Sequence, residues 1–260
     1  MRLRDALTRP LYRAYERRLL NGLDRSLLPN HIGVIHDGHR RFTRETGLPD
    51  YTAGYERGMD KFLEFLGWCG ELDVPAVTCW LLSKENLSRP ASELIPYFEV
   101  LAGLFDRLPD APGAEGVCIK VIGSLGLLPD DLRASAERMV ERSNGGQRRV
   151  TIAVAYGGRQ EIVDACRDLV GALAAEGIPA AEIASHVEAD ALAAHLYTAD
   201  LPDPDLVIRT SGESRLSGFL LWQAAYAEYA FTDVYWPAFR RVDFLRALRD
   251  FTRRHRRFGQ

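Results

Sequence analysis

Two short segments of the chain carry residue types that bind phosphate, and each follows an apolar run. The first is Asp37-Gly38-His39-Arg40-Arg41, which comes directly after the apolar residues 32–35. The second is residues 209–218, R-T-S-G-E-S-R-L-S-G, which come directly after the apolar residues 206–208. Guanidinium groups donate paired hydrogen bonds to phosphate oxygens, and small residues let backbone N–H groups face an anion. These segments predict two phosphorylated substrates, or one long one.

Asp37 is the residue of the first segment with the clearest chemical use. A carboxylate beside arginines suits a divalent cation that bridges bound phosphates. The structural alternative is that Asp37 caps the start of a helix. His36 and His39 also allow a metal-ligand interpretation, although residues three apart at a strand end share no fixed direction. Ser211 lacks the G-x-S-x-G surroundings of a hydrolase nucleophile, and the chain has no P-loop motif.

One further carboxylate lies in an unusually aromatic stretch. Residues 219–232 read F-L-L-W-Q-A-A-Y-A-E-Y-A-F-T and contain Glu228. In such surroundings a carboxylate is paired, metal-bound or raised in pKa.

The elements that must position these residues alternate between apolar runs and helical patterns. The expected strands cover residues 32–36, 76–82, 117–122, 150–156, 206–209 and 229–232. The expected helices cover residues 54–71, 91–107, 130–142, 159–175, 180–187, 191–196 and 242–254. Continuously apolar strands separated by helices predict a mostly parallel six-stranded sheet in a single α/β domain. The site of such a domain lies at the carboxyl ends of its strands.

The composition excludes several classes of protein. The net charge of -3 argues against a nucleic-acid binder. No apolar run approaches the roughly 18 residues of a membrane span, and no signal core is present, so we expect a cytoplasmic protein. Its four cysteines are scattered, which suits reduced thiols.

Residues 1–29 form a separate amphipathic segment ahead of the domain at 30–260. Pro10 suits a first helical position, so a helix is expected to begin there. One face of this helix is apolar, with Leu11, Tyr15, Leu19 and Leu23. The other face is basic, with Arg13, Arg17 and Arg18. Such a helix either packs on the domain or makes weak peripheral membrane contact.

In their order along the chain, these segments resemble the cis-prenyltransferases, the undecaprenyl diphosphate synthase family. The resemblance covers residues 30–259, and its ordered set is specific although each motif alone is weak. The matching segments are His31 with Asp37-Gly38, Ser83-Lys84-Glu85-Asn86 with Arg89, Tyr156-Gly157-Gly158-Arg159, residues 205–223, Ala227-Glu228, Trp236-Pro237 and residues 256–259.

The resemblance implies a homodimer that condenses isopentenyl diphosphate with an allylic diphosphate, such as dimethylallyl or geranyl diphosphate, using Mg2+. It assigns to Asp37 the binding of the metal beside the departing diphosphate. It also places Glu228 near this metal as a second acidic residue. The allylic diphosphate would be held by Gly38, Arg40, Arg41 and Arg89. The second diphosphate would be held by Arg209, Arg215 and Ser217, with Arg257 and Gly259 reaching the partner subunit's site.

Leu81 bears on product length. It falls where long-chain members of the family carry a small residue, so we expect a short product of about C10 to C20, with C15 favoured. The alternative is that Leu81 belongs to the core and that the hydrocarbon tail runs elsewhere.

The chain departs from the family pattern beside Asp37. His39 replaces the asparagine of D-G-N, and Tyr55 replaces the histidine of a second motif. His39 could take over proton removal, since imidazole titrates near neutrality. Alternatively, the second substrate has changed, as in head-to-middle (lavandulyl-type) synthases that join dimethylallyl and geranyl diphosphates, for example into a sesquilavandulyl skeleton for a specialised metabolite. A catalytically silent partner subunit is a third interpretation, and the presence of Asp37 and Arg209 speaks against it.

Overall fold

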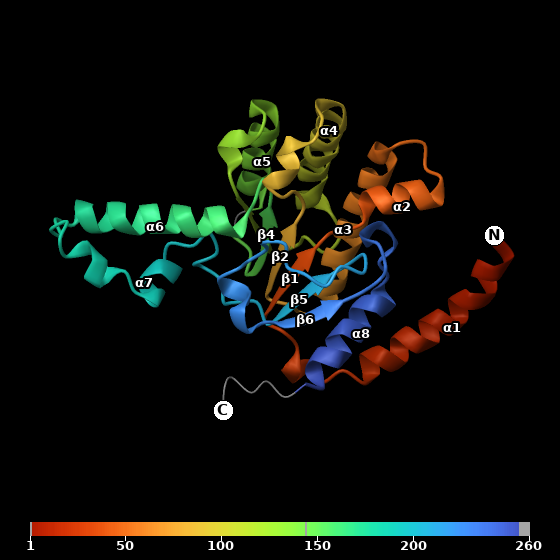
Figure 1. Cartoon of the computed structure of the whole chain (residues 1–260). Helices are drawn as coiled ribbons and strands as arrows, with labels where there is room; N and C mark the ends of the chain where they lie inside the picture. The colour runs from red at the N-terminus through yellow and green to blue at the C-terminus, as the bar shows by residue number, and fades with distance from the viewer. Residues whose placement is uncertain (1, 144, 255–260) are drawn as a thin grey trace.

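The computed structural model describes residues 2–143 and 145–254 of the chain, with side chains from residue 10 onward. Six strands form one parallel sheet in the order β3-β4-β2-β1-β5-β6 (Figure 1). Their bounds are β1 His31–Ile35, β2 Ala76–Trp80, β3 Val117–Ile122, β4 Arg148–Ala153, β5 Leu206–Arg209 and β6 Glu228–Phe231. The predicted single α/β domain is confirmed, and every strand pair of this sheet is parallel.

Helices cover the sheet unequally. The helices are α1 Arg2–Asn21, α2 His39–Thr46, α3 Tyr51–Glu71, α4 Ala91–Arg107, α5 Asp130–Arg142, α6 Gly158–Ala175, α7 Ala189–Ala193 and α8 Arg241–Thr252. One face of the sheet and helices α3, α4, α5 and α8 share the large apolar core. The opposite face is covered by a smaller cluster around Phe219 and Leu220, and the α6–α7 arm projects from that side (Figure 1).

Several predicted element bounds are wrong. Helix α1 begins at Arg2 rather than at Pro10, which lies inside it. Helix α2 was not predicted, and the expected helix at 180–187 is only a 3-10 turn at Ile183–His186. Strands β2 and β4 end two and three residues earlier than expected, at Trp80 and Ala153.

The N-terminal segment packs on α8. Leu19 and Leu23 are buried in the main core, and the Tyr15 hydroxyl meets the Arg246 guanidinium. Leu11 of the same face stays 71% exposed. In the described part of the chain, no helix is long and apolar enough to cross a membrane.

Candidate active site

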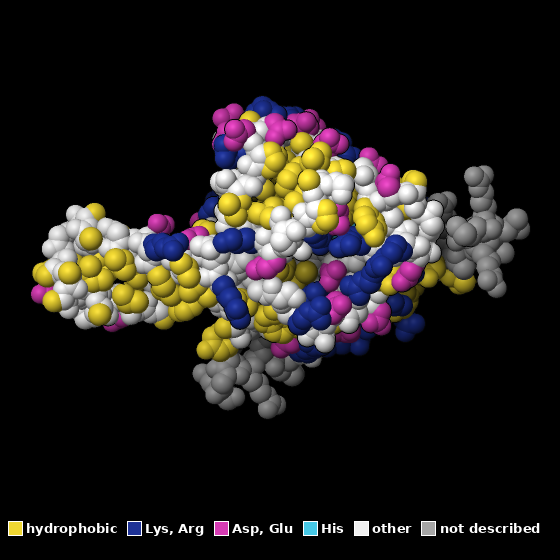
Figure 2. Space-filling model, turned by 45° about the horizontal axis from the view of Figure 1, so that its top comes forward, with side chains coloured by type: hydrophobic (Ala, Val, Ile, Leu, Met, Phe, Trp, Pro, Cys, Tyr) yellow, Lys and Arg dark blue, Asp and Glu magenta, His cyan; other side chains and the backbone are white. Residues whose placement is uncertain are grey.

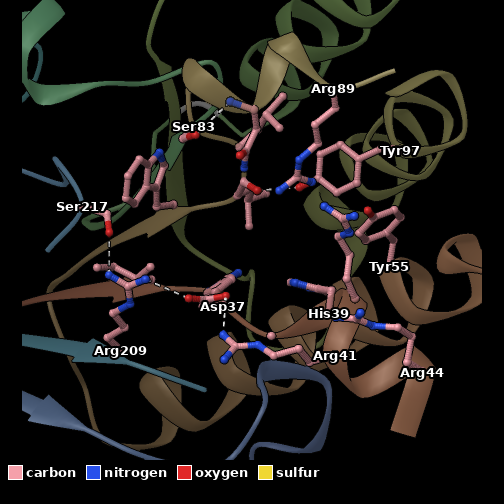
Figure 3. Close-up of a pocket in the computed structure, with 18 residues that line it drawn as sticks. Asp37, His39, Arg41, Arg44, Tyr55, Ser83, Arg89, Tyr97, Arg209 and Ser217 are labelled. Carbon is pink, nitrogen blue, oxygen red and sulfur yellow. Dashed lines mark hydrogen bonds and ion pairs between the residues drawn. The ribbon is translucent and has the colours of Figure 1, made fainter. Parts of the chain in front are cut away.

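The two predicted phosphate-binding segments meet at the carboxyl edge of the sheet. Strands β1 and β5 pair so that Ile35 lies opposite Arg209, which brings Asp37 to the Arg209 side chain. One guanidinium nitrogen of Arg209, Nη2, donates to Asp37 Oδ2 at 2.8 Å. Its Nη1 donates to Ser217 Oγ at 2.8 Å (Figure 3). The same nitrogen also donates to the backbone carbonyl of Arg215. Asp37, Arg209 and Ser217 therefore form one cluster, as the sequence predicts.

Gly38 turns the chain from β1 directly into α2. Its φ of 102° is in the left-handed region, and a Cβ there would lie 2.6 Å from Tyr235 Cδ1 and 2.9 Å from Ser211 Cβ. Only glycine meets both requirements. The tight turn puts Arg41 one helical turn from Asp37, with Arg41 Nη2 at 3.4 Å from Asp37 Oδ1 and 2.6 Å from Ser211 Oγ.

Two arginines hold Asp37 in its charged form. Burial by itself would raise the pKa of the carboxyl. The hydrogen bond and charge of Arg209, the hydroxyl of Ser211 and the charge of Arg41 outweigh that effect and lower the pKa below its ordinary value. Asp37 is therefore an ionised carboxylate at neutral pH, as a metal ligand must be.

Asp37 opens onto a cavity of about 480 Å³. Arg40, Arg41, Arg44 and Arg89 line this cavity, and three of them, Arg40, Arg41 and Arg89, are partly exposed. Its apolar and aromatic lining residues are buried, and they are Ile35, Trp80, Leu81, Leu82, Tyr55 and Tyr97. On this side of the molecule, Lys and Arg side chains gather with carboxylates between them (Figure 2). A charged mouth and an apolar interior suit a ligand with an anionic head and a hydrocarbon tail.

The predicted residues of the allylic diphosphate site come together at this mouth. Arg89 Nη1 lies 3.0 Å from Glu93 Oε1, and Arg40 Nη2 lies 3.7 Å from Glu93 Oε2. One carboxylate on α4 therefore holds two arginines that come from different segments.

Arg215, predicted for the second diphosphate, lies further out, with 67% of its side chain exposed and an ion pair to Glu213 at 2.6 Å.

His36 is buried and His39 is half-buried, and they hold no shared metal site. His36 stacks on Trp236 with ring centroids 3.6 Å apart, and burial lowers its pKa well below the ordinary value. His39 lines the cavity, and its Nε2 is enclosed against Gly58 with no hydrogen-bond partner among the described residues. Across residues 2–143 and 145–254, no group of three His, Cys, Asp or Glu side chains could hold a metal ion.

Burial lowers the pKa of His39 from 6.5 to about 4, against the raising effect of the Asp37 charge. The unfolded chain therefore binds a proton on this imidazole below pH 6.5, whereas the folded chain does not until pH about 4. The contribution of the neutral His39 imidazole to the free energy of unfolding is complete above pH 6.5 and is lost as the pH falls toward 4.

His39→Asn is expected to remove this pH dependence. On lowering the pH from 7.5 to 4.5, the unfolding free energy of the wild type should fall by about 2 kcal/mol more than that of the variant. Urea titrations of both proteins at each pH measure the difference. Equal losses in the two proteins would show that His39 titrates normally.

Glu228 does not lie with Asp37 in the same subunit. Glu228 begins β6 beside Leu206, which pairs with Ile32 at the start of β1. Asp37 follows five residues after Ile32, so the two carboxylates are roughly 16 Å apart along the strand direction. Glu228 instead pairs with Arg254 at 2.7 Å. Within one chain the structure therefore does not bring Glu228 to Asp37, and the role of Glu228 near the metal stays a prediction.

Arg257 and Gly259, predicted to reach the partner's site, lie outside the described residues. Conversely, the cavity contains residues that sequence reasoning missed, among them Arg44, Tyr55, Trp80 and Tyr97. Of these, only Tyr55 had a sequence signal, because it replaces a histidine of the family pattern. The place of Arg44 in the cavity lining follows once helix α2 is known, because Arg44 lies one helical turn after Arg40.

The cavity mouth suits Mg2+ that is bound by one protein carboxylate and by substrate phosphates. Mg2+ commonly uses one or two carboxylates and takes its other ligands from substrate phosphates and water. Asp37 supplies one such carboxylate, is ionised, and keeps 29% of its side chain exposed toward the cavity. Arginines that can hold phosphate lie on both sides of it.

Comparison with known proteins agrees with this site. The family described as "Putative undecaprenyl diphosphate synthase" matches residues 35–259. The chain is 48% identical to a (2Z,6E)-farnesyl diphosphate synthase of Mycolicibacterium smegmatis, over 98% of this chain and 97% of the relative. It is 49% identical to a (2Z,6E)-farnesyl diphosphate synthase of Thermobifida fusca, over 96% and 97%.

A solved structure is also similar. The lavandulyl diphosphate synthase from Lavandula x intermedia, in complex with dimethylallyl diphosphate, aligns with a TM-score of 0.83 at 30% identity. The alignment covers 90% of this chain and 100% of that one. The chain therefore belongs to the undecaprenyl diphosphate synthase family and is a prenyltransferase.

Proposed function

We propose that the chain is a short-chain prenyl diphosphate synthase that condenses isopentenyl diphosphate with an allylic diphosphate to a product of about C15. The observation that carries the proposal is the Asp37 carboxylate between two groups of arginines, at the mouth of a cavity whose inner part is apolar. The names of the Mycolicibacterium and Thermobifida relatives support the same product length.

The arginines and the apolar wall have separate tasks in this reaction. Loss of diphosphate from an allylic substrate leaves a carbocation and a diphosphate anion that carries one negative charge more than the bound substrate did. Arg40, Arg41 and Arg89 hold the anion where its charge develops. The chemistry that Mg2+ supplies, when it is bound at Asp37, is stabilisation of that same charge. The apolar lining keeps water from the carbocation.

The second diphosphate is held at Arg209, Arg215 and Ser217. The geometry makes this binding competitive with the Asp37–Arg209 ion pair, since both require the Arg209 guanidinium. His39 is neutral at pH 7 because burial lowers its pKa to about 4. It lines the cavity, and so low a pKa makes it a weak base for the proton that the new bond releases.

A homodimer is part of this proposal. Strand β6 is an edge strand of the sheet, and Phe231 on it is 45% exposed. Valines of the projecting arm, Val163 and Val170, are 44% and 42% exposed. Apolar exposure on an open edge and an arm fits a second copy of the chain. Sedimentation velocity should give twice the mass of one chain, and a monomer at micromolar concentration would contradict it.

A head-to-middle synthase is the second candidate, supported by His39 in place of asparagine and by the lavandulyl diphosphate synthase structure. Two incubations with Mg2+ separate the candidates. Isopentenyl plus geranyl diphosphate should give a linear C15 diphosphate by mass spectrometry. Dimethylallyl plus geranyl diphosphate should give no branched product. Branched product without isopentenyl diphosphate would reject the first candidate, and no product from either pair would reject both.

Leu81→Ala is expected to lengthen the product. Leu81 is 8% exposed and lines the inner part of the cavity, where its side chain occupies space that a longer tail needs. Reversed-phase separation of the products should show at least part of the material one five-carbon unit longer. A length distribution identical to the wild type would assign Leu81 to the core alone.

A further inference from the structure

Arg44 differs from the other arginines of the cavity in having no acidic partner. The arginines that line the cavity are Arg40, Arg41, Arg44, Arg89 and Arg209. Each of the others is paired with a carboxylate, that of Glu93 or of Asp37, at 2.8–3.7 Å. Among residues 10–143 and 145–254, whose side chains the structure describes, no carboxylate pairs with Arg44.

Close packing of α2 on α3 holds Arg44 at the cavity without an ion pair. Thr43, the residue before it, is buried, and a Cβ on Gly54 of α3 would lie 1.9 Å from Thr43 Oγ1. One turn later in α3, a Cβ on Gly58 would lie 2.1 Å from His39 Nε2. Larger residues at these positions would push the helices apart. The two glycines therefore fix the backbone of α2, and only the Arg44 side chain is left to move.

The charge of Arg44 is available to an incoming anion. The side chain is exposed, and the neighbouring carboxylate of Glu45 accepts a hydrogen bond from the Tyr235 hydroxyl at 2.6 Å instead. A guanidinium that is already paired divides its N–H donors and its charge between the first anion and the second. Because Arg44 has no such partner, it offers a phosphate its full charge and all its N–H donors.

The position of Arg44 along α2 indicates which part of a ligand it meets. The helix begins two residues after Asp37, and Arg44 lies one turn beyond Arg40, roughly 6 Å further along the helix axis. Figure 3 shows Arg44 on the same side of the cavity as His39 and Arg41. In the proposed reaction the phosphate next to the hydrocarbon lies near Asp37. A second phosphate extends the head group outward, and Arg44 is the next cation of α2 in that direction.

We propose that Arg44 binds the outer phosphate of the allylic diphosphate and makes this site selective for a diphosphate over a monophosphate head group. This inference rests on the proposed synthase function. An allylic monophosphate can still be held by Arg40 and Arg41, but it leaves Arg44 without a ligand. Binding of isopentenyl diphosphate, which the proposed function assigns to Arg209, does not depend on Arg44.

Two ligands that differ by one phosphate test the proposal. Calorimetry with geranyl diphosphate and with geranyl monophosphate, without Mg2+ and at about 0.15 M salt, measures binding by the protein's own cations. Arg44→Gln, whose folding circular dichroism checks, should bind the diphosphate about tenfold more weakly than the wild type does. The affinity for the monophosphate should change less than about twofold, because the Arg44 charge is screened beyond direct contact.

A conservative variant and a matched control accompany this measurement. Arg44→Lys keeps the charge but not the planar fork, so its affinity for the diphosphate should lie between those of the wild type and Arg44→Gln. Arg138→Gln changes an exposed arginine of α5 outside the cavity lining and should match the wild type. Equal weakening of both ligands in Arg44→Gln, or an unchanged affinity for the diphosphate, would overturn the proposal.

Kinetics with Mg2+ provide a second readout. Arg44→Gln should raise KM for geranyl diphosphate about tenfold and change KM for isopentenyl diphosphate less than about twofold. An equal rise in both KM values would also overturn the proposal, since it would indicate general damage to the site. A wild type that prefers the diphosphate through Arg44 but forms no product would overturn only the proposed function.

Discussion

Asp37→Ala is expected to reduce prenyl transfer by a factor of about 10³ or more, measured as kcat with isopentenyl and geranyl diphosphates. The variant loses the one carboxylate among the residues that line the cavity, which lies between Arg41 and Arg209. It therefore loses the ligand for Mg2+, while the arginines can still bind diphosphate. We expect kcat to fall far more than the affinity for the allylic substrate.

The fold of this variant is expected to survive. The Arg209 guanidinium that loses its carboxylate is 5% exposed but keeps its bonds to Ser217 and to the Arg215 carbonyl, so the substitution costs about 3 kcal/mol, less than the total stability of an ordinary domain. Asp37→Asn keeps the shape and should be as inactive as the alanine variant. Asp130→Ala, at a side chain 92% exposed, is the matched control and should keep full activity. Near-normal turnover of either Asp37 variant would remove this carboxylate from the mechanism.

Arg209→Lys is expected to lower kcat/KM for isopentenyl diphosphate by about 10²–10³. The Arg209 guanidinium is 5% exposed and bonds in two directions, to Asp37 and to Ser217. A lysine ammonium keeps the charge but cannot span both partners with a planar fork. Initial-rate kinetics at varied isopentenyl diphosphate measure the loss.

The same substitution at an exposed site provides the comparison. Arg167→Lys changes a side chain that is 72% exposed and paired with Asp164, and it should leave the kinetics unchanged. If Arg209→Lys instead changed only the affinity for the allylic substrate, the second diphosphate site would have to lie elsewhere.

Most strands of the sheet could be predicted because their signal is local. Residues 206–208 are apolar on consecutive positions, as buried parallel strands require, and residues 117–122 are apolar except for Lys120; the predicted bounds 117–122 and 206–209 agree with the structure. Helix α2 could not be predicted in this way, since H-R-R-F-T-R-E-T has few apolar residues and follows a glycine. It forms because Gly38 takes a left-handed conformation in a space enclosed by Tyr235 and Ser211, which are distant in sequence.

The residues of the site also differ in whether a local sequence signal predicts their positions. Asp37 and Arg209 could be paired from the sequence because both follow adjacent apolar strands at one sheet edge. The place of Glu228 could not be predicted, because a motif gives the residue type but not the end of the strand on which it lies. Tyr97 was missed since its position depends on how α4 packs against α3, which no local pattern encodes.

The most direct test of the site is a crystal structure with Mg2+, isopentenyl diphosphate and a non-hydrolysable geranyl thiolodiphosphate. We predict the allylic diphosphate against Gly38, Arg40 and Arg41, with Mg2+ on Asp37 and the geranyl tail pointing toward Leu81 and Tyr97. The second diphosphate should lie on Arg209. An allylic diphosphate bound away from Asp37, or a tail directed out of the cavity, would contradict the account.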